Sequence, residues 1–144
     1  MASQIYNEFK RANAAGEIDL NADDIRFALL MTNTTADTEN DGIINLNDFT
    51  TLDEHATAGR KALANEAVNK DDANDRAEFD ADDVTWTALA NGARAIAGAL
   101  IYKHVDGTDA NDLVIAWIEF ASTQNPGGSD FTIQFNAEGI LQLT

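Results

Sequence analysis

The chain has 144 residues, 25 of them acidic and 9 basic, and a formal net charge of −16. This length suffices for one domain with a real hydrophobic core, so we expect a single domain over residues 1–144. The chain has no cysteine, which excludes disulfides and thiolate chemistry. The negative charge argues against nucleic acid as a direct partner, because phosphates would be repelled, and the 44% apolar content argues against disorder.

Two features of the sequence argue against a membrane association. The longest apolar run lies near residues 113–118 and is far too short to span a bilayer. The first residues, MASQIYNEFKRANAAGE, lack the apolar centre of a signal peptide. We therefore expect no membrane partner and synthesis in a cytoplasm.

The first predicted element is a short helix over residues 3–14. Ile5, Phe9 and Ala12 recur at helical spacing and form one apolar stripe, and Gly16 provides a stop. The period then changes, and residues 24–31 (DIRFALLM) are typical of a buried strand.

Residues 32–59 are polar and rich in turn residues, which predicts a long polar loop at the surface. One short helical turn is expected inside it. Asn45 would cap this turn, and Phe49 with Leu52 would pack inward.

The rest of the chain reads as short strands separated by turns. The period-two pattern at residues 131–135 predicts a half-buried strand, and the final ILQLT is expected to be its hairpin partner. Without long crossover helices, about eight strands and one helix predict a mainly β fold, an antiparallel β-sandwich. The other strands are expected at residues 61–68 and 75–80 as a hairpin, at 84–86, and at 93–103 and 113–120 as central strands.

The stretch at 37–48, DTENDGIINLND, matches the letters of an EF-hand loop. Asp37, Glu39, Asp41 and Asp48 fall at ligand positions and Gly42 falls at the turn. However, the flanking residues have no helical period and no second loop matches. We interpret the loop as turn chemistry, assign no metal and no cofactor, and leave open whether it binds a cation.

No catalytic constellation is evident, so an enzyme is not expected. His55 and His104 lie far apart and read as solvated loop histidines. Trp117 is expected in the core, and Trp86 would serve as a sugar platform only if exposed. The grouped carboxylates are interpreted as wet turn residues that bond their own backbone; they are Asp71 and Asp72, then Asp80, Asp82 and Asp83, then Asp106, Asp109 and Asp112.

Three segments carry a resemblance that covers nearly the whole chain. They are RKALANEAVNKDDANDRAEFDADDVTW at residues 60–86, ALIYKHVDGTDANDLVIAWIEF at 99–120, and FTIQFNAEGILQLT at 131–144. Together they resemble a family of small virion structural proteins of tailed bacteriophages. The sequence departs from the family pattern mainly between residues 32 and 59.

The resemblance implies a non-enzymatic structural protein, one that decorates or cements the capsid exterior. Its partners would be the major capsid protein and neighbouring copies of itself, and it would be made in the host bacterial cytoplasm. We expect Ile5, Tyr6 and Phe9 either to contribute contacts to the capsid or to cover an open end of the sandwich. The alternatives are a tail or head–tail connector subunit, or a glycan-binding sandwich on the virion that uses Trp86 and a loop cation.

Overall fold

The computed structural model describes residues 3–144. Within them, it contains ten strands, one α-helix and one 3₁₀ turn. The strands are β1 (Gln4–Ile5), β2 (Ile25–Met31), β3 (Lys61–Ala62), β4 (Ala67–Asp71), β5 (Arg76–Asp80), β6 (Val84–Leu89), β7 (Ile96–Lys103), β8 (Leu113–Gln124), β9 (Ser129–Ile133) and β10 (Leu141–Leu143), the helix is α1 (Asn7–Ala14), and the 3₁₀ turn is η1 (Leu46–Asp48).

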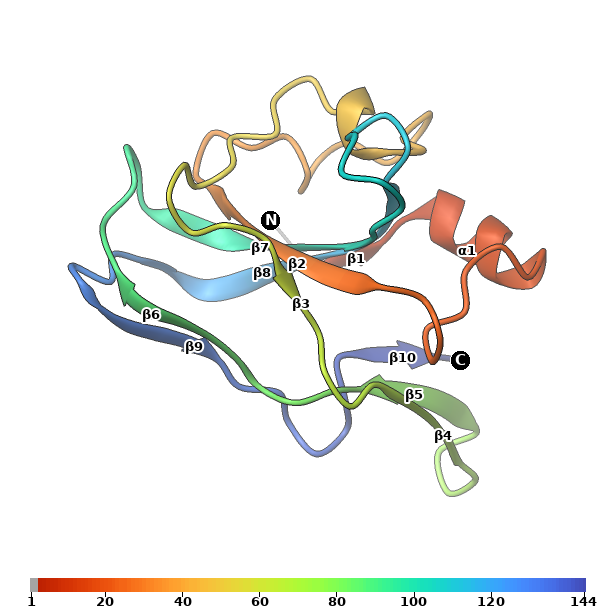
Figure 1. The fold of residues 1–144 in the computed structure, drawn as a ribbon. Helices are drawn as coiled ribbons and strands as arrows, with labels where there is room; N and C mark the ends of the chain where they lie inside the picture. The colour runs from red at the N-terminus through yellow and green to blue at the C-terminus, as the bar shows by residue number, and fades with distance from the viewer. Residues whose placement is uncertain (1–2) are drawn as a thin grey trace.

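The strands form two layers, which confirms the predicted mainly β, antiparallel sandwich-like fold. One layer is a five-stranded sheet in the order β1-β8-β7-β2-β3. The other holds two small sheets, β6-β9 and β10-β5-β4. These lie end to end in Figure 1, because β5 leads directly into β6 and β9 leads on towards β10.

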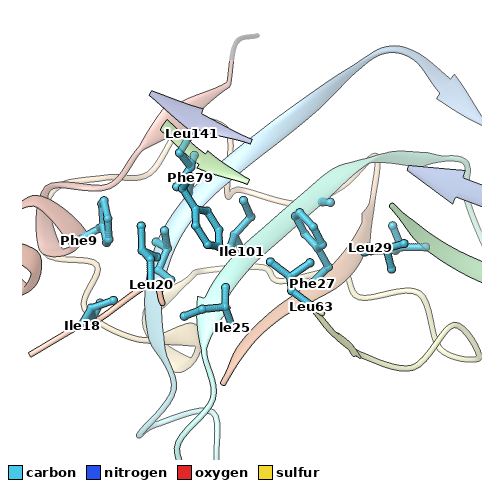
Figure 2. Packing of buried hydrophobic residues seen from close by; sticks show 14 of the residues in the cluster. Phe9, Ile18, Leu20, Ile25, Phe27, Leu29, Leu63, Phe79, Ile101 and Leu141 are labelled. Carbon is cyan, nitrogen blue, oxygen red and sulfur yellow. The ribbon is translucent and has the colours of Figure 1, made fainter. Parts of the chain in front are cut away.

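The inner core fills the space between the two layers. Phe27 on β2 and Ile101 on β7 meet Phe79 on β5 and Leu141 on β10 in one cluster of buried side chains (Figure 2). Each of these four side chains is 5% exposed or less. Burying one such side chain is worth about 1.5–3 kcal/mol, so this cluster supplies much of the free energy of folding.

A second core lies on the outer face of the five-stranded sheet. Residues 32–59 cross this face (Figure 1) and pack on Leu30, Leu100 and Tyr102 from the central strands. The predicted helical turn is confirmed as η1, with Asn45 at its N-cap. The predicted polar loop does lie at the surface, and Phe49 packs inward as expected. Beyond the prediction, its apolar side chains cover the sheet; those buried are Ala36, Ile43, Leu46 and Phe49.

The N-terminal segment is part of the scaffold. The helix begins at Asn7 rather than residue 3, because Gln4 and Ile5 pair with Trp117 and Ala116 of β8 as strand β1. Tyr6 and Phe9 are 0% exposed, so the expectation that they contact a capsid is wrong and the covering role is the one observed. In residues 3–144 no helix has the length and apolar character needed to cross a membrane.

Two strand pairings differ from the sequence-based prediction. The hairpin is confirmed as β4–β5, but residues 61 and 62 pair with β2 instead of extending it. The final strand β10 pairs with β5 and not with β9. The segment before it is not a hairpin turn, since Gly139 adopts a φ of +81° and Ile140 donates to the Phe79 carbonyl at 2.7 Å. Strand β10 therefore runs in the same direction as β9, but it pairs with β5, the strand before β6.

Gly98 in the middle of β7 sets how closely β8 can approach. A Cβ added there would lie 2.2 Å from the Ile118 carbonyl oxygen and 2.5 Å from the Trp117 ring. We predict that Gly98→Ala lowers the free energy of unfolding by about 2–3 kcal/mol, because the backbone of β8 must shift. Thermal melting followed by circular dichroism measures the effect.

Gly16→Ala is the matched control for this substitution. A Cβ at Gly16 meets nothing within 4 Å, and only its positive φ of +73° is unfavourable. Its cost should stay near 1 kcal/mol. An unchanged melting midpoint for Gly98→Ala would contradict the close approach of β7 and β8.

Candidate functional site

An open groove lies between the two layers, along β8 and β9. It has a volume of about 740 Å³. Its apolar lining comes from half-buried side chains of both layers, namely Ile118, Phe120, Phe131, Ile133, Phe135 and Ile140. We call this surface the β8–β9 groove.

The groove continues towards the N-terminal strand. A second hollow of about 310 Å³ reaches Gln4 and Gln142. It shares Ile118, Asn136 and Ile140 with the first hollow, so the two form one elongated surface. The groove therefore runs along β8 and passes both β9 and β10.

Aromatic contacts hold the walls of the groove in place. The rings of Phe120 and Phe131 lie 5.8 Å apart across the opening, and Phe131 lies 6.1 Å from Trp86. Phe135 stacks on Phe27 at 5.7 Å. The groove is thus backed by the inner core.

One strand beside the groove has an unpaired edge. Strand β9 is one of only two strands in its sheet and pairs with β6. Among residues 3–144, no backbone group is bonded along the other edge of β9. Such an edge can accept a further strand. The edge and the apolar lining together can bind an extended chain.

Arg60 is the centre of a cluster of charged side chains. Its guanidinium donates to Glu54 at 3.0 and 2.8 Å and to Asp109 Oδ1 at 2.7 Å, and it lies 5.4 Å from the centre of the Tyr102 ring. The bonds to Glu54 raise the pKa of Arg60, and burial raises the pKa of Tyr102 to about 12. The Arg60 guanidinium is thus bonded to Glu54 and Asp109, and these bonds tie residues 54–60 to the loop before β8.

Asp112 and His104 belong to the same cluster, and both differ from expectation. Asp112 is 0% exposed, with Oδ1 accepting from the Val105 backbone N–H at 2.8 Å and Oδ2 lying 3.3 Å from His104 Nδ1. The interpretation of Asp112 as a wet turn residue and of His104 as a solvated histidine is therefore wrong. The carboxylate is internal because it closes the loop that leads into β8.

His55 and Trp86 are also buried, so the expectation of a solvated His55 is wrong and the condition for a sugar platform at Trp86 is not met. His55 is 2% exposed, with Nε2 at 3.1 Å from the Ala90 carbonyl and Nδ1 accepting from the Ala58 N–H at 3.2 Å. Trp86 is 2% exposed, and its indole N–H donates to the Gly59 carbonyl at 3.0 Å. Trp86 is therefore no sugar platform. Trp117 is confirmed as a core residue at 1% exposed.

Several of the grouped aspartates do behave as predicted turn residues. Asp71 accepts from the Ala73 N–H at 3.2 Å, and Asp106 accepts from the Thr108 N–H at 2.9 Å. These bonds contribute to lowering the pKa of both carboxyls, with the Asn74 side chain giving the largest effect at Asp71. Both groups stabilise local turns.

The 37–48 loop is built around Glu39 and Asp48. Glu39 accepts from the Thr35 hydroxyl at 2.7 Å and from the Thr50 N–H at 2.9 Å, and Asp48 accepts from the Ile44 N–H at 2.9 Å. Strand β2 precedes the loop and η1 lies inside it, so the arrangement is not a helix–loop–helix. In the described part of the chain, no group of three or more His, Asp or Glu side chains is placed to hold a metal.

The sequence alone did not predict the β8–β9 groove. The alternation at Phe131, Ile133 and Phe135 predicted a half-buried strand but not what faces it. The available signal was charge, because the chain has no lysine or arginine after Lys103. No protein-family model, curated protein or solved structure matches the chain.

We predict that Asp112→Ala destabilises the protein by about 2–4 kcal/mol, because it leaves the Val105 N–H unpaired and removes a carboxylate facing Arg60. Urea unfolding measures the loss. Asp72→Ala, at a side chain that is 75% exposed, is the control and should change stability by less than about 0.5 kcal/mol. Equal effects of the two substitutions would contradict the internal role of Asp112.

We also predict a pH-dependent effect for Glu39→Gln. Hydrogen bonds from Thr50 and Thr35 lower the pKa of Glu39 from the ordinary value of 4.5, so the folded state favours the ionised carboxylate. This contribution is complete above about pH 5.5 and is lost as the pH falls through the folded pKa. Glu39→Gln should therefore cost about 1 kcal/mol at pH 7 and progressively less below pH 4.5.

Melting curves of the wild type and the variant between pH 3 and 7 give the comparison. Glu66→Gln serves as the control and should show no such convergence. A Glu39→Gln effect that stays constant over this range would refute the assigned role of the carboxylate.

Proposed function

We propose that the protein is a non-enzymatic structural component of a bacteriophage virion, which decorates or cements the capsid by binding the lattice of the major capsid protein. The observation that carries the proposal is where the family-like segments fall. Residues 60–86 include β3, β4 and β5, residues 99–120 include most of β7 and the first part of β8, and residues 131–144 include β10. The resemblance thus covers the scaffold of both layers.

The residues that depart from the family pattern, 32–59, lie together on one face of the fold. Residues 32–59 lie on the outer face of the five-stranded sheet (Figure 1), away from the β8–β9 groove. Variation there falls on the cover of the outer face and not on the groove. A family that shares one way of attachment can therefore differ in this loop.

The charge of the protein fits attachment to a repeating surface. With a net charge of −16, free copies repel one another in solution. Copies would then be placed side by side by the lattice beneath them and not by self-association. Modest contacts repeated over a shell add up to a large stabilisation of the shell.

The acidic and cationic groups support a binding role over a catalytic one. Arg60, Asp112 and His55 are each held by fixed partners inside the scaffold. The glycan-binding alternative depended on an exposed Trp86, which is 2% exposed. The β8–β9 groove is elongated and has aromatic residues in its lining, and aromatic residues are enriched in interfaces between proteins.

Cryo-electron microscopy of the virion, combined with quantitative mass spectrometry, tests the proposal. We expect density for this fold on the icosahedral shell, with a copy number that scales with that of the major capsid protein. A few rings along the tail axis would make the protein a tail or connector subunit. Its absence from purified virions would refute a structural role.

A further inference from the structure

We propose that the β8–β9 groove binds an extended segment of the partner protein that alternates apolar with lysine or arginine side chains, by adding a strand beside β9. The identity of that partner as the major capsid protein rests on the proposed function. The chemistry of the segment rests on the groove itself.

The shape of the groove selects an extended chain. The two joined hollows are lined by β8 residues from Ala116 to Gln124. At about 3.3 Å per residue this stretch is roughly 25–30 Å long, the length of eight or nine residues of a strand. A compact ligand would fill only a part of it.

The apolar lining matches the side-chain spacing of a strand. Phe131, Ile133 and Phe135, at every second position of one wall, are half-buried against the inner core, whereas Thr132 and Gln134 between them are exposed. Phe120 lies on the other wall. A strand that adds to an edge buries every second side chain, and its main chain bonds to the edge. The unpaired edge of β9 and this row of apolar side chains are therefore parts of one binding surface.

The overall charge of the chain indicates the sign of the partner. Its net charge is −16, and from residue 104 to the C-terminus it has no lysine or arginine. In the described part of the chain, no lysine or arginine lines the groove. Positive side chains on the occupant complement this surface.

The same charge argues against a second copy as the occupant. Two copies each carry a net charge of −16, and the last third of the chain offers no cation to the other copy. A basic segment of a different protein meets no such repulsion. The occupant is therefore a partner and not another copy of this chain.

A displayed library of ten-residue peptides tests the inference on the intact protein. Library positions alternate between Val, Ile, Leu or Phe and Lys, Glu, Ser or Thr. We expect lysine to be enriched over glutamate by at least about tenfold among the peptides that bind, a difference of about 1.4 kcal/mol. Binding should fall steeply as the salt concentration rises.

Two double variants locate the binding. Ala121→Lys with Gln134→Lys places cations at two exposed positions of the groove. Ala73→Lys with Asn69→Lys likewise replaces one alanine and one carboxamide residue by lysine, at exposed positions on or beside β4, with the same net charge of the whole chain. The groove variant should weaken the selected peptides at least about tenfold, and the β4 variant less than about twofold.

Each outcome decides the inference. It is overturned by a library that yields no binder, by equal loss in the two double variants, or by enrichment of glutamate. Self-association of the protein that the selected peptides inhibit would make the occupant a second copy and would also overturn it. The proposed function fails separately, because absence from the virion would leave peptide binding unchanged, whereas a shell location without peptide binding would refute only the groove.

Discussion

The structure depends on one constraint, which is that strand β7 is buried on both faces. Seven consecutive residues, from Ile96 to Tyr102, are buried. Successive side chains of a strand point to opposite faces, so each face of the central sheet needs its own cover. The inner face is covered by the second layer, and the outer face by residues 32–59. Each of the other elements can be understood from the face on which it packs.

Burial on both faces also determines what the polar groups do. The loops that cover the sheet carry Asp112, His55 and Glu39 inward or against the backbone, where each needs fixed donors or acceptors. The observed bonds supply them, and they tie distant segments together. Residue types that elsewhere perform chemistry are therefore used here to close loops. The β8–β9 groove lies outside these bonds and is the surface on which we propose recognition.

The strands and the helix follow from local patterns, which is why they were predictable. Period-two alternation and apolar runs reveal β2, β7, β8 and β9, and the 3₁₀ turn follows from Asn45 together with the inward Phe49. Pairing was less predictable, because β10 resembles a hairpin arm yet pairs with β5. Local sequence does not specify which of two nearby strands accepts the next one.

The candidate site was hidden for a related reason. Turn composition around Asp112 and His55 is the same whether a loop faces water or covers a sheet, so their burial could not be read from neighbouring residues. The groove depends on β8 and β9 facing each other across the layers, a contact between distant segments. Only the absence of cations after Lys103 was visible in the sequence.

Amide hydrogen exchange at residues 32–59 tests the central claim that this segment is the cover of a second core. If it is, the amides of Ile43, Leu46 and Thr50, which are bonded within the segment or to neighbouring loops, exchange slowly and respond to denaturant together with the amides of β7. If the segment is an exposed excursion, the same amides exchange at the rate of an unfolded peptide while β7 stays protected. That second result would contradict the account.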